Sequence, residues 1–130
     1  MILVDTHIAY WAITNSENLP NTARALFQSE QRFCFSVASV WEIELKHRKN
    51  PDKVPLSGKQ FYLACLDAGM TCISVRAYHI FELENLLKDK NYHEDPFDHL
   101  LLAVAKSENH LLLTHDEKMN HYPGVNVIMC

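Results

Sequence analysis

Two carboxylates stand directly before a strongly apolar run in the segment DPFDHLLLA, residues 95–103. Asp95 and Asp98 are three residues apart, and the apolar run behind them extends from 100 to 105. A segment of this kind is buried on most of its faces, and an unpaired carboxylate at the edge of a core costs free energy. The two acids therefore either cap a helix or hold something positive.

Helix capping explains part of this segment. Asp95 is predicted to be the N-cap of a helix, and Pro96 suits the first helical position. Asp98 would then be the third helical residue, where a negative charge favours the helix dipole. Capping accounts for Asp95, but it accounts only in part for Asp98, which faces the beginning of a buried helix.

Three more acids stand where predicted elements begin. Asp5 follows the apolar run MILV and suits the N-cap position, and Glu42 completes an S-x-x-E capping box with Ser39. Asp116 comes just after LLLT and suits a turn or a cap. Taken one at a time, each of these acids has a local role that needs no chemistry.

The elements that would position these acids alternate between strands and helices. Apolar runs predict strands at 1–4, 33–37, 71–75, 111–114 and 125–129. Helices are predicted at 7–14, 22–30, 39–49, 57–68, 77–87 and 97–108, with a charged loop at 88–94 and a loop or short helix at 115–121. This alternation indicates an α/β fold with a central, mostly parallel sheet covered by helices on both faces.

A parallel sheet would bring the acids to one edge. Ligands of such sheets bind outside the carboxyl ends of the strands, where Asp5 and Asp116 are expected. Glu42 belongs to the first predicted turn of a helix that follows a strand directly, so it begins at the same edge, whereas Asp98 follows a long loop. Three or four carboxylates in one pocket repel one another without a cation, and their oxygens suit Mg²⁺ or Mn²⁺. Such ions activate water and stabilise charge on a phosphoryl group.

Composition sets further bounds. The chain has 130 residues and is 48% hydrophobic, which fits a single domain over 1–130 with a sizeable core. Its formal net charge of −4 does not suggest a general nucleic-acid binder, which is usually basic. The longest apolar run is too short to cross a membrane and the N-terminus has no basic leader, so we expect a cytoplasmic protein. The cysteines form no CxxC pair, which argues against a zinc site and, in the cytoplasm, disulfides are not expected.

Four motifs together resemble a known family. MILVDTHIAYWAI, SVASVWEIELK, HEDPFDHLLLAVA and LLLTHDEKM occur in this order and span nearly the whole chain. The sequence resembles PIN-domain ribonucleases and, among them, the VapC-like toxins of type II toxin–antitoxin pairs. The resemblance implies a three-layer PIN-like fold and a Mg²⁺- or Mn²⁺-dependent ribonuclease that hydrolyses RNA phosphodiester bonds with a metal-activated water.

The resemblance also implies roles and partners. It makes Asp5, Glu42 and Asp98 the central metal-binding and catalytic acids and Asp116 the fourth, with Thr6, Thr114 and Asp95 in supporting positions. Relatives form homodimers and are silenced by a small antitoxin, so the implied partners are RNA, a cognate antitoxin and a second copy, with no membrane.

Two positions depart from the family pattern. His99 stands where many relatives carry Arg, and this change can alter substrate contacts or a salt bridge without removing a metal ligand. Met119 stands near the place where relatives often show an aromatic residue beyond the fourth acid.

Other residues have two interpretations. The one dense basic run contains Lys46, Arg48 and Lys49, which are candidates for RNA contact together with His99. Alternatively, the run forms a solvated helix end whose positive charge favours the helix dipole. His7, His93, His99 and His115 lie near the acidic edge, where a histidine without a catalytic role is the simpler interpretation. Trp11 and Trp41 suit base stacking, but their apolar surroundings favour core packing.

Two other functions remain open from the residues. An acidic metal pocket in an α/β sheet also serves phosphoesterases and nucleases that act on DNA. The chain would otherwise be a metal-binding or interaction module without catalysis, although the presence of all four acids argues against a degenerate site.

Overall fold

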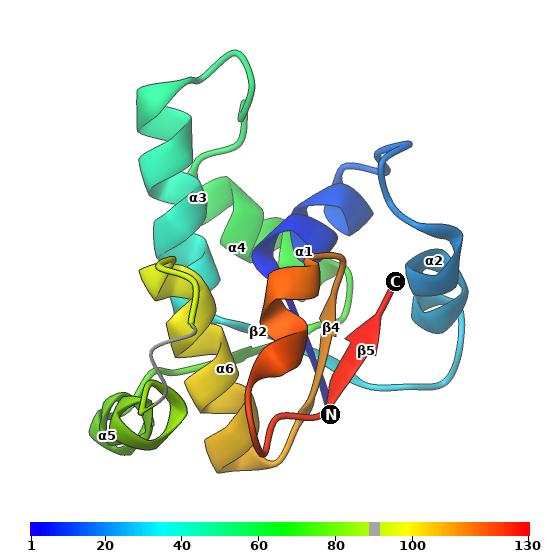
Figure 1. Ribbon diagram of the computed structural model, residues 1–130. Helices are drawn as coiled ribbons and strands as arrows, with labels where there is room; N and C mark the ends of the chain where they lie inside the picture. The colour runs from blue at the N-terminus through cyan, green and yellow to red at the C-terminus, as the bar shows by residue number, and fades with distance from the viewer. Residues whose placement is uncertain (89–91) are drawn as a thin grey trace.

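The computed structural model describes residues 1–88 and 92–130, and a five-stranded sheet forms the centre of this part (Figure 1). The strands are β1 (Ile2–Val4), β2 (Phe33–Ser36), β3 (Thr71–Ile73), β4 (Leu111–Thr114) and β5 (Val127–Met129). They lie in the order β3-β2-β1-β4-β5, and all neighbours are parallel. The predicted α/β fold with a central parallel sheet is confirmed. The loop predicted at 88–94 falls partly outside the described residues.

Helices cover both faces of the sheet. They are α1 (Thr6–Ile13), α2 (Asn21–Phe27), α3 (Val37–Lys49), α4 (Gly58–Asp67), α5 (Ala77–Leu86) and α6 (Pro96–Glu108), with a 3₁₀ helix η1 (Glu117–His121). Side chains of a strand alternate between the two faces, so Ile2 and Val4 pack in one core cluster with residues of α1, α2 and α4. Leu3 lies in the other cluster, with residues of α5, α6 and η1. The two clusters give the three predicted layers.

The start of α3 differs from the prediction. We expected a helix from Ser39 with a capping box to Glu42, but the helix begins at Val37 and Ser36 is its N-cap. The Ser36 hydroxyl accepts a hydrogen bond from the Ala38 backbone amide at 3.0 Å. Strand β2 therefore passes directly into the helix, and Glu42 lies in its second turn. The capping-box interpretation of Glu42 and its placement in the first turn were both wrong.

Trp41 also differs from the prediction. Its side chain is 59% exposed on α3 rather than packed in the core. Its ring lies edge-on to that of Phe97, with the ring centroids 5.0 Å apart. Trp11, by contrast, is partly buried against the core, as predicted. The four cysteines are free, and no described helix is long and apolar enough to cross a membrane.

The chain path creates a crevice between β1 and β4. After β1 the chain adds β2 and then β3 on one side, and it later returns across the sheet to add β4 and β5 on the other. Helices that start from β1 and β4 consequently diverge to opposite faces, which leaves a crevice at the carboxyl ends of these two strands. Asp5 follows β1 and Asp116 lies just beyond β4, so both stand at this crevice.

Candidate active site

Asp5 is the most enclosed of the predicted acids. It is 4% exposed, and one carboxylate oxygen accepts a hydrogen bond from the Thr6 amide at 2.7 Å. The other oxygen accepts from the Thr114 hydroxyl, also at 2.7 Å. Within the described residues Asp5 forms no ion pair. Burial raises the pKa of Asp5, and the nearby charge of Glu42 adds to this, although the two hydrogen bonds oppose it.

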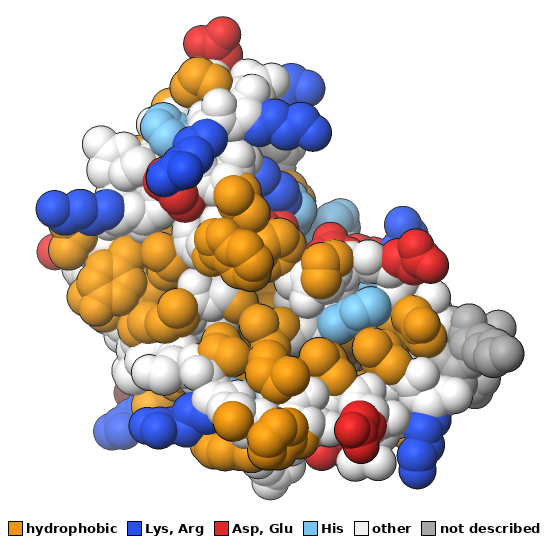
Figure 2. All heavy atoms as spheres, turned by 90° about the vertical axis from the view of Figure 1, so that its left-hand side faces the viewer, with side chains coloured by type: hydrophobic (Ala, Val, Ile, Leu, Met, Phe, Trp, Pro, Cys, Tyr) orange, Lys and Arg blue, Asp and Glu red, His pale blue; other side chains and the backbone are white. Residues whose placement is uncertain are grey.

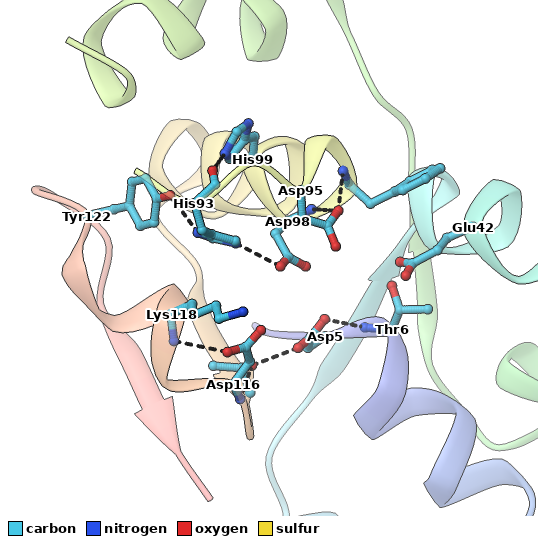
Figure 3. Close-up of polar contacts among 12 residues, drawn as sticks. Asp5, Thr6, Glu42, His93, Asp95, Asp98, His99, Asp116, Lys118 and Tyr122 are labelled. Atoms are coloured by element: carbon cyan, nitrogen blue, oxygen red, sulfur yellow. Dashed lines mark hydrogen bonds and ion pairs between the residues drawn. The ribbon is translucent and has the colours of Figure 1, made fainter. Parts of the chain in front are cut away.

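Asp98 faces Asp5 from the first turn of α6 (Figure 3). It is 8% exposed, and its Oδ2 lies 2.8 Å from His93 Nε2. Burial raises the pKa of Asp98 to about 7, and the charge of Asp5 adds to the rise while the hydrogen bond from His93 opposes it. The buried charge of Asp5 thus disfavours charge on Asp98, which is the electrostatic setting that a cation relieves.

Glu42 reaches the same space from α3 but is paired within the chain. Its carboxylate is buried, and Oε2 lies 2.7 Å from Lys46 Nζ, one turn further along the helix. The same ammonium lies 3.3 Å from His7 Nε2. Lys46 therefore neutralises Glu42. By contrast, Asp5, Asp98 and Asp116 have no lysine or arginine partner among the ion pairs of the described residues.

Asp116 is half-buried and caps η1. Its side chain accepts a hydrogen bond from the Lys118 amide at 3.0 Å, and its own amide donates to Thr114 Oγ1 at 3.0 Å. Thr114 therefore connects Asp116 to Asp5. The two acids line an open cavity of about 330 Å³ together with His7, Trp11 and His115.

The four carboxylates surround one space but do not form a closed ligand cage. Figure 3 shows Asp5, Asp98, Glu42 and Asp116 directed toward a common gap. Over residues 1–88 and 92–130, no three or more His, Cys, Asp or Glu side chains lie close enough to bind one ion together. The donor set still fits a hard divalent cation, because Asp5 and Asp98 are buried oxygen donors whose charge has no full positive partner.

The supporting residues fix the positions of the acids. Thr6 Oγ1 and Ser39 Oγ are 2.8 Å apart, which ties the start of α1 to α3. Asp95 accepts hydrogen bonds from the amides of Phe97 at 2.9 Å and Asp98 at 3.2 Å, so its predicted role as the N-cap of α6 is confirmed. The capping predicted for Asp5 and Asp116 is also present, in addition to their place at the crevice.

The residues predicted to contact RNA are mostly engaged within the chain. Lys46 is paired with Glu42, and Arg48 Nε lies 2.6 Å from Glu44 Oε2. His99 is 9% exposed, and its Nε2 is hydrogen-bonded to the His93 carbonyl oxygen. Of the two interpretations of His99, the structure therefore favours an internal role over contact with RNA. Lys49 is exposed at the end of α3.

The sequence analysis assigned no role to two residues that lie near Asp98 in the structure. His93 was expected to have no catalytic role, yet it bonds Asp98 directly, and Tyr122 was not considered although its hydroxyl lies 2.7 Å from His93 Nδ1. The short spacing between His93 and Asp98 in HEDPFD was the available signal for the first. Tyr122 lies 24 residues after Asp98, and no local pattern connects the two.

Comparison with known proteins agrees with this architecture. The PIN domain family matches residues 2–125, so the chain belongs to the PIN domain family. No curated protein matches in a sequence search. Among solved structures, VapBC2 from Rickettsia felis bound to a promoter DNA fragment superposes with a TM-score of 0.76 at 20% identity, covering 100% of this chain and 99% of that one.

Two further solved structures are similar. VapBC from Salmonella typhimurium, bound to DNA, gives a TM-score of 0.72 at 18% identity and covers 98% of this chain and 96% of that one. VapC20 of Mycobacterium tuberculosis, a toxin that cleaves the sarcin–ricin loop, gives a TM-score of 0.67 at 18% identity and covers 97% of this chain and 99% of that one. At these identities the likeness establishes the fold that the chain shares with them.

Proposed function

We propose that this PIN-domain protein is a metal-dependent endoribonuclease and the toxin of a toxin–antitoxin pair. Asp5 and Asp98 would hold Mg²⁺ or Mn²⁺, with Glu42 and Asp116 completing the acidic site. The observation that carries the proposal is the pair of buried carboxylates, Asp5 and Asp98, that face one another across the crevice, where the charge of Asp5 adds to the raised pKa of Asp98. Burying such a pair without a cation costs free energy, and a divalent ion offsets that cost.

The chain's own residues prepare this site. Thr6 and Thr114 each donate to one oxygen of Asp5, and His93 bonds one oxygen of Asp98. Among the described residues, the second oxygen of Asp98 has no hydrogen-bond partner and is directed toward the gap (Figure 3). A divalent ion held there would lower the pKa of water and stabilise charge on a phosphoryl group. No side chain is needed as a nucleophile, which agrees with a site made of carboxylates and threonine hydroxyls.

The choice of RNA as substrate rests on the family. One similar structure is that of a toxin that cleaves an RNA loop. In this chain, His7 and His115 line the cavity beside Asp5 and Asp116. The Lys46 ammonium lies 3.3 Å from His7 Nε2, and Figure 3 shows the Lys118 side chain beside Asp116. These groups would approach the phosphates of a bound strand, although the net charge of the whole chain is negative.

The proposed protein partners are a small antitoxin and a second copy of the chain. Several similar structures are toxin–antitoxin complexes. On α3, Val37, Trp41 and Leu45 recur at intervals of four residues and are 44%, 59% and 42% exposed. Figure 2 shows hydrophobic side chains gathered on the face of the molecule that lies to the left in Figure 1, where α3, α5 and α6 lie. An apolar stripe of this kind supports a protein partner.

Cleavage of a pool of structured RNAs by antitoxin-free protein tests the activity. We expect cutting with Mg²⁺ or Mn²⁺, none with chelator, and none with Asp98→Asn. Asp67→Asn, which changes an exposed acid at the end of α4, is the matched control and should cut as wild type does. Cutting that survives Asp98→Asn would contradict the proposed site, and cleavage of single-stranded DNA but not RNA would contradict the proposed substrate.

A further inference from the structure

Building on the proposed function, we propose that Tyr122 and His93 are positioning residues for Asp98. Their side chains form a hydrogen-bonded chain that fixes the proton of His93 and the orientation of the Asp98 carboxylate. The proposal concerns how the acid is presented to a divalent cation, and it assigns neither residue a contact with the reacting atoms.

The geometry of the chain is continuous (Figure 3). Tyr122 Oη lies 2.7 Å from His93 Nδ1, and His93 Nε2 lies 2.8 Å from Asp98 Oδ2. The three residues come from different places: Tyr122 follows η1, His93 precedes α6, and Asp98 is in the first turn of α6. Tyr122 is 8% exposed and packs in the core cluster under α6, so its hydroxyl is held in place.

One form of His93 uses every donor proton in this series of contacts. A tyrosine hydroxyl has one proton, and an ionised Asp98 can only accept. Both contacts are satisfied when the hydroxyl donates to a bare Nδ1 and the proton on Nε2 is donated to Asp98. His93 is then neutral. Asp98 is oriented without being neutralised, in contrast to Glu42, which a lysine ammonium contacts.

A second contact ties His93 to the helix that carries Asp98. His99, the residue after Asp98, bonds the His93 carbonyl oxygen through Nε2. The rings of His93, His99 and Tyr122 also pack edge-on, with centroids 5.4 to 6.4 Å apart. The His93 backbone and ring are thus both held, and this explains why His99 is directed inward rather than toward substrate.

Tyr122→Phe tests the chain with the smallest possible change, because it removes one hydroxyl and keeps the packed ring. Partners that orient a metal-binding group typically change metal affinity or activity by 10- to 100-fold. We expect Tyr122→Phe to weaken Mn²⁺ binding, measured by calorimetry, about tenfold and to lower kcat for RNA with KM unchanged.

Tyr78→Phe is the matched control. The Tyr78 hydroxyl donates to Glu108 Oε1 at 2.6 Å, in a similar Tyr–His–Glu cluster. Glu108 lies ten residues beyond Asp98 on α6, roughly 15 Å along the helix axis. We expect Tyr78→Phe to bind Mn²⁺ and cut RNA as wild type does. If Tyr122→Phe also stays within twofold of wild type in both measurements, the positioning role is refuted.

The proton of His93 gives a readout that needs no activity. In ¹⁵N-detected spectra of the Mg²⁺-loaded protein, we expect His93 to be neutral with its proton on Nε2 and the tautomer to become mixed in Tyr122→Phe. A proton on Nδ1 in the wild type would overturn the proposal. If Tyr122→Phe does not fold, His93→Gln and His93→Ala replace it. Glutamine keeps a donor for Asp98, so it should retain more Mn²⁺ affinity than alanine, and equal losses would refute the role.

The outcomes separate this proposal from the proposed function. If Asp98→Asn abolishes metal-dependent RNA cleavage while Tyr122→Phe has no effect, the nuclease stands and the positioning role fails. If no RNA is cut by any form but Mn²⁺ affinity and the tautomer respond to Tyr122→Phe, the positioning role stands and the proposed substrate fails.

Discussion

Replacement of Thr114 by valine should show how strongly the crevice depends on one hydroxyl. Thr114 is fully buried at the end of β4, where its hydroxyl donates to Asp5 at 2.7 Å and accepts from the Asp116 amide at 3.0 Å. Valine keeps the shape and the strand preference but satisfies neither group. A buried acceptor left without its hydrogen bond costs about 1 to 3 kcal/mol, and the Asp116 amide, being half-buried, adds less than 1 kcal/mol. We expect the free energy of unfolding of the metal-free protein at pH 8 to fall by about 3 kcal/mol.

Urea unfolding of Thr114→Val and wild type measures this difference. The loss should shrink at low pH, since the hydroxyl stabilises the charged form of Asp5, and its removal raises the pKa of that carboxyl further. Thr71→Val is the matched control, because Thr71 is an exposed threonine on β3, and its effect should stay within about 0.5 kcal/mol. If Thr114→Val lowers the free energy of unfolding at pH 8 by no more than Thr71→Val does, the buried hydrogen bond between Thr114 and Asp5 is refuted.

Four further predictions concern pH, capping and packing. Because burial raises the pKa of Asp98 to about 7, Mn²⁺ must displace a proton from this carboxyl below that pH. Calorimetry from pH 5 to pH 8 should therefore show that the affinity for Mn²⁺ falls by up to about tenfold for each pH unit below 7. The unfolded chain releases that proton near the ordinary value of 3.8, so the metal-free protein should lose stability as pH rises from about 4 to 7, and Mg²⁺ should restore it in thermal melts. Asp95→Ala should lower the free energy of unfolding by about 1 kcal/mol because the helix loses its cap. The affinity for Mn²⁺ should stay within about threefold of wild type, and a larger loss would show that Asp95 does more than cap α6. Gly58→Ala would place a Cβ 2.8 Å from the Val40 carbonyl oxygen and 2.9 Å from Glu44 Cβ, so urea unfolding should show a loss of about 1 to 3 kcal/mol, and wild-type stability would contradict the close contact of α3 with α4.

The sequence predicts the architecture well because apolar periodicity follows burial. Residues 2–4, 33–36 and 112–114 are buried on both faces of a central sheet, and they form continuous apolar stretches in the sequence. The start of α3 was misplaced because Ser36 and Ser39 both suit an N-cap, and only the direct passage from β2 into the helix decides between them. Ser39 instead bonds Thr6, a contact across 33 residues that no local pattern indicates.

The placement of the acids is also predictable, whereas their partners are not. The fold class alone brings Asp5 and Asp116 to one edge of a parallel sheet, and the observed strand order, with β1 beside β4, brings them to one crevice. The pairing of Glu42 with Lys46 depends on which side of α3 faces that crevice. Likewise, the exposure of Trp41 depends on which side of α3 no other element covers. The contact of Tyr122 with His93 arises from the packing of η1 against α6, which sequence spacing does not encode.

The most direct test of the metal site is anomalous diffraction from crystals soaked in MnCl₂. We expect a manganese peak in the crevice between β1 and β4, with carboxylate oxygens of both Asp5 and Asp98 as ligands and with His93 still bonded to Asp98. A peak elsewhere, or none at a Mn²⁺ concentration that supports RNA cleavage, would contradict the claim that these two buried acids hold the ion.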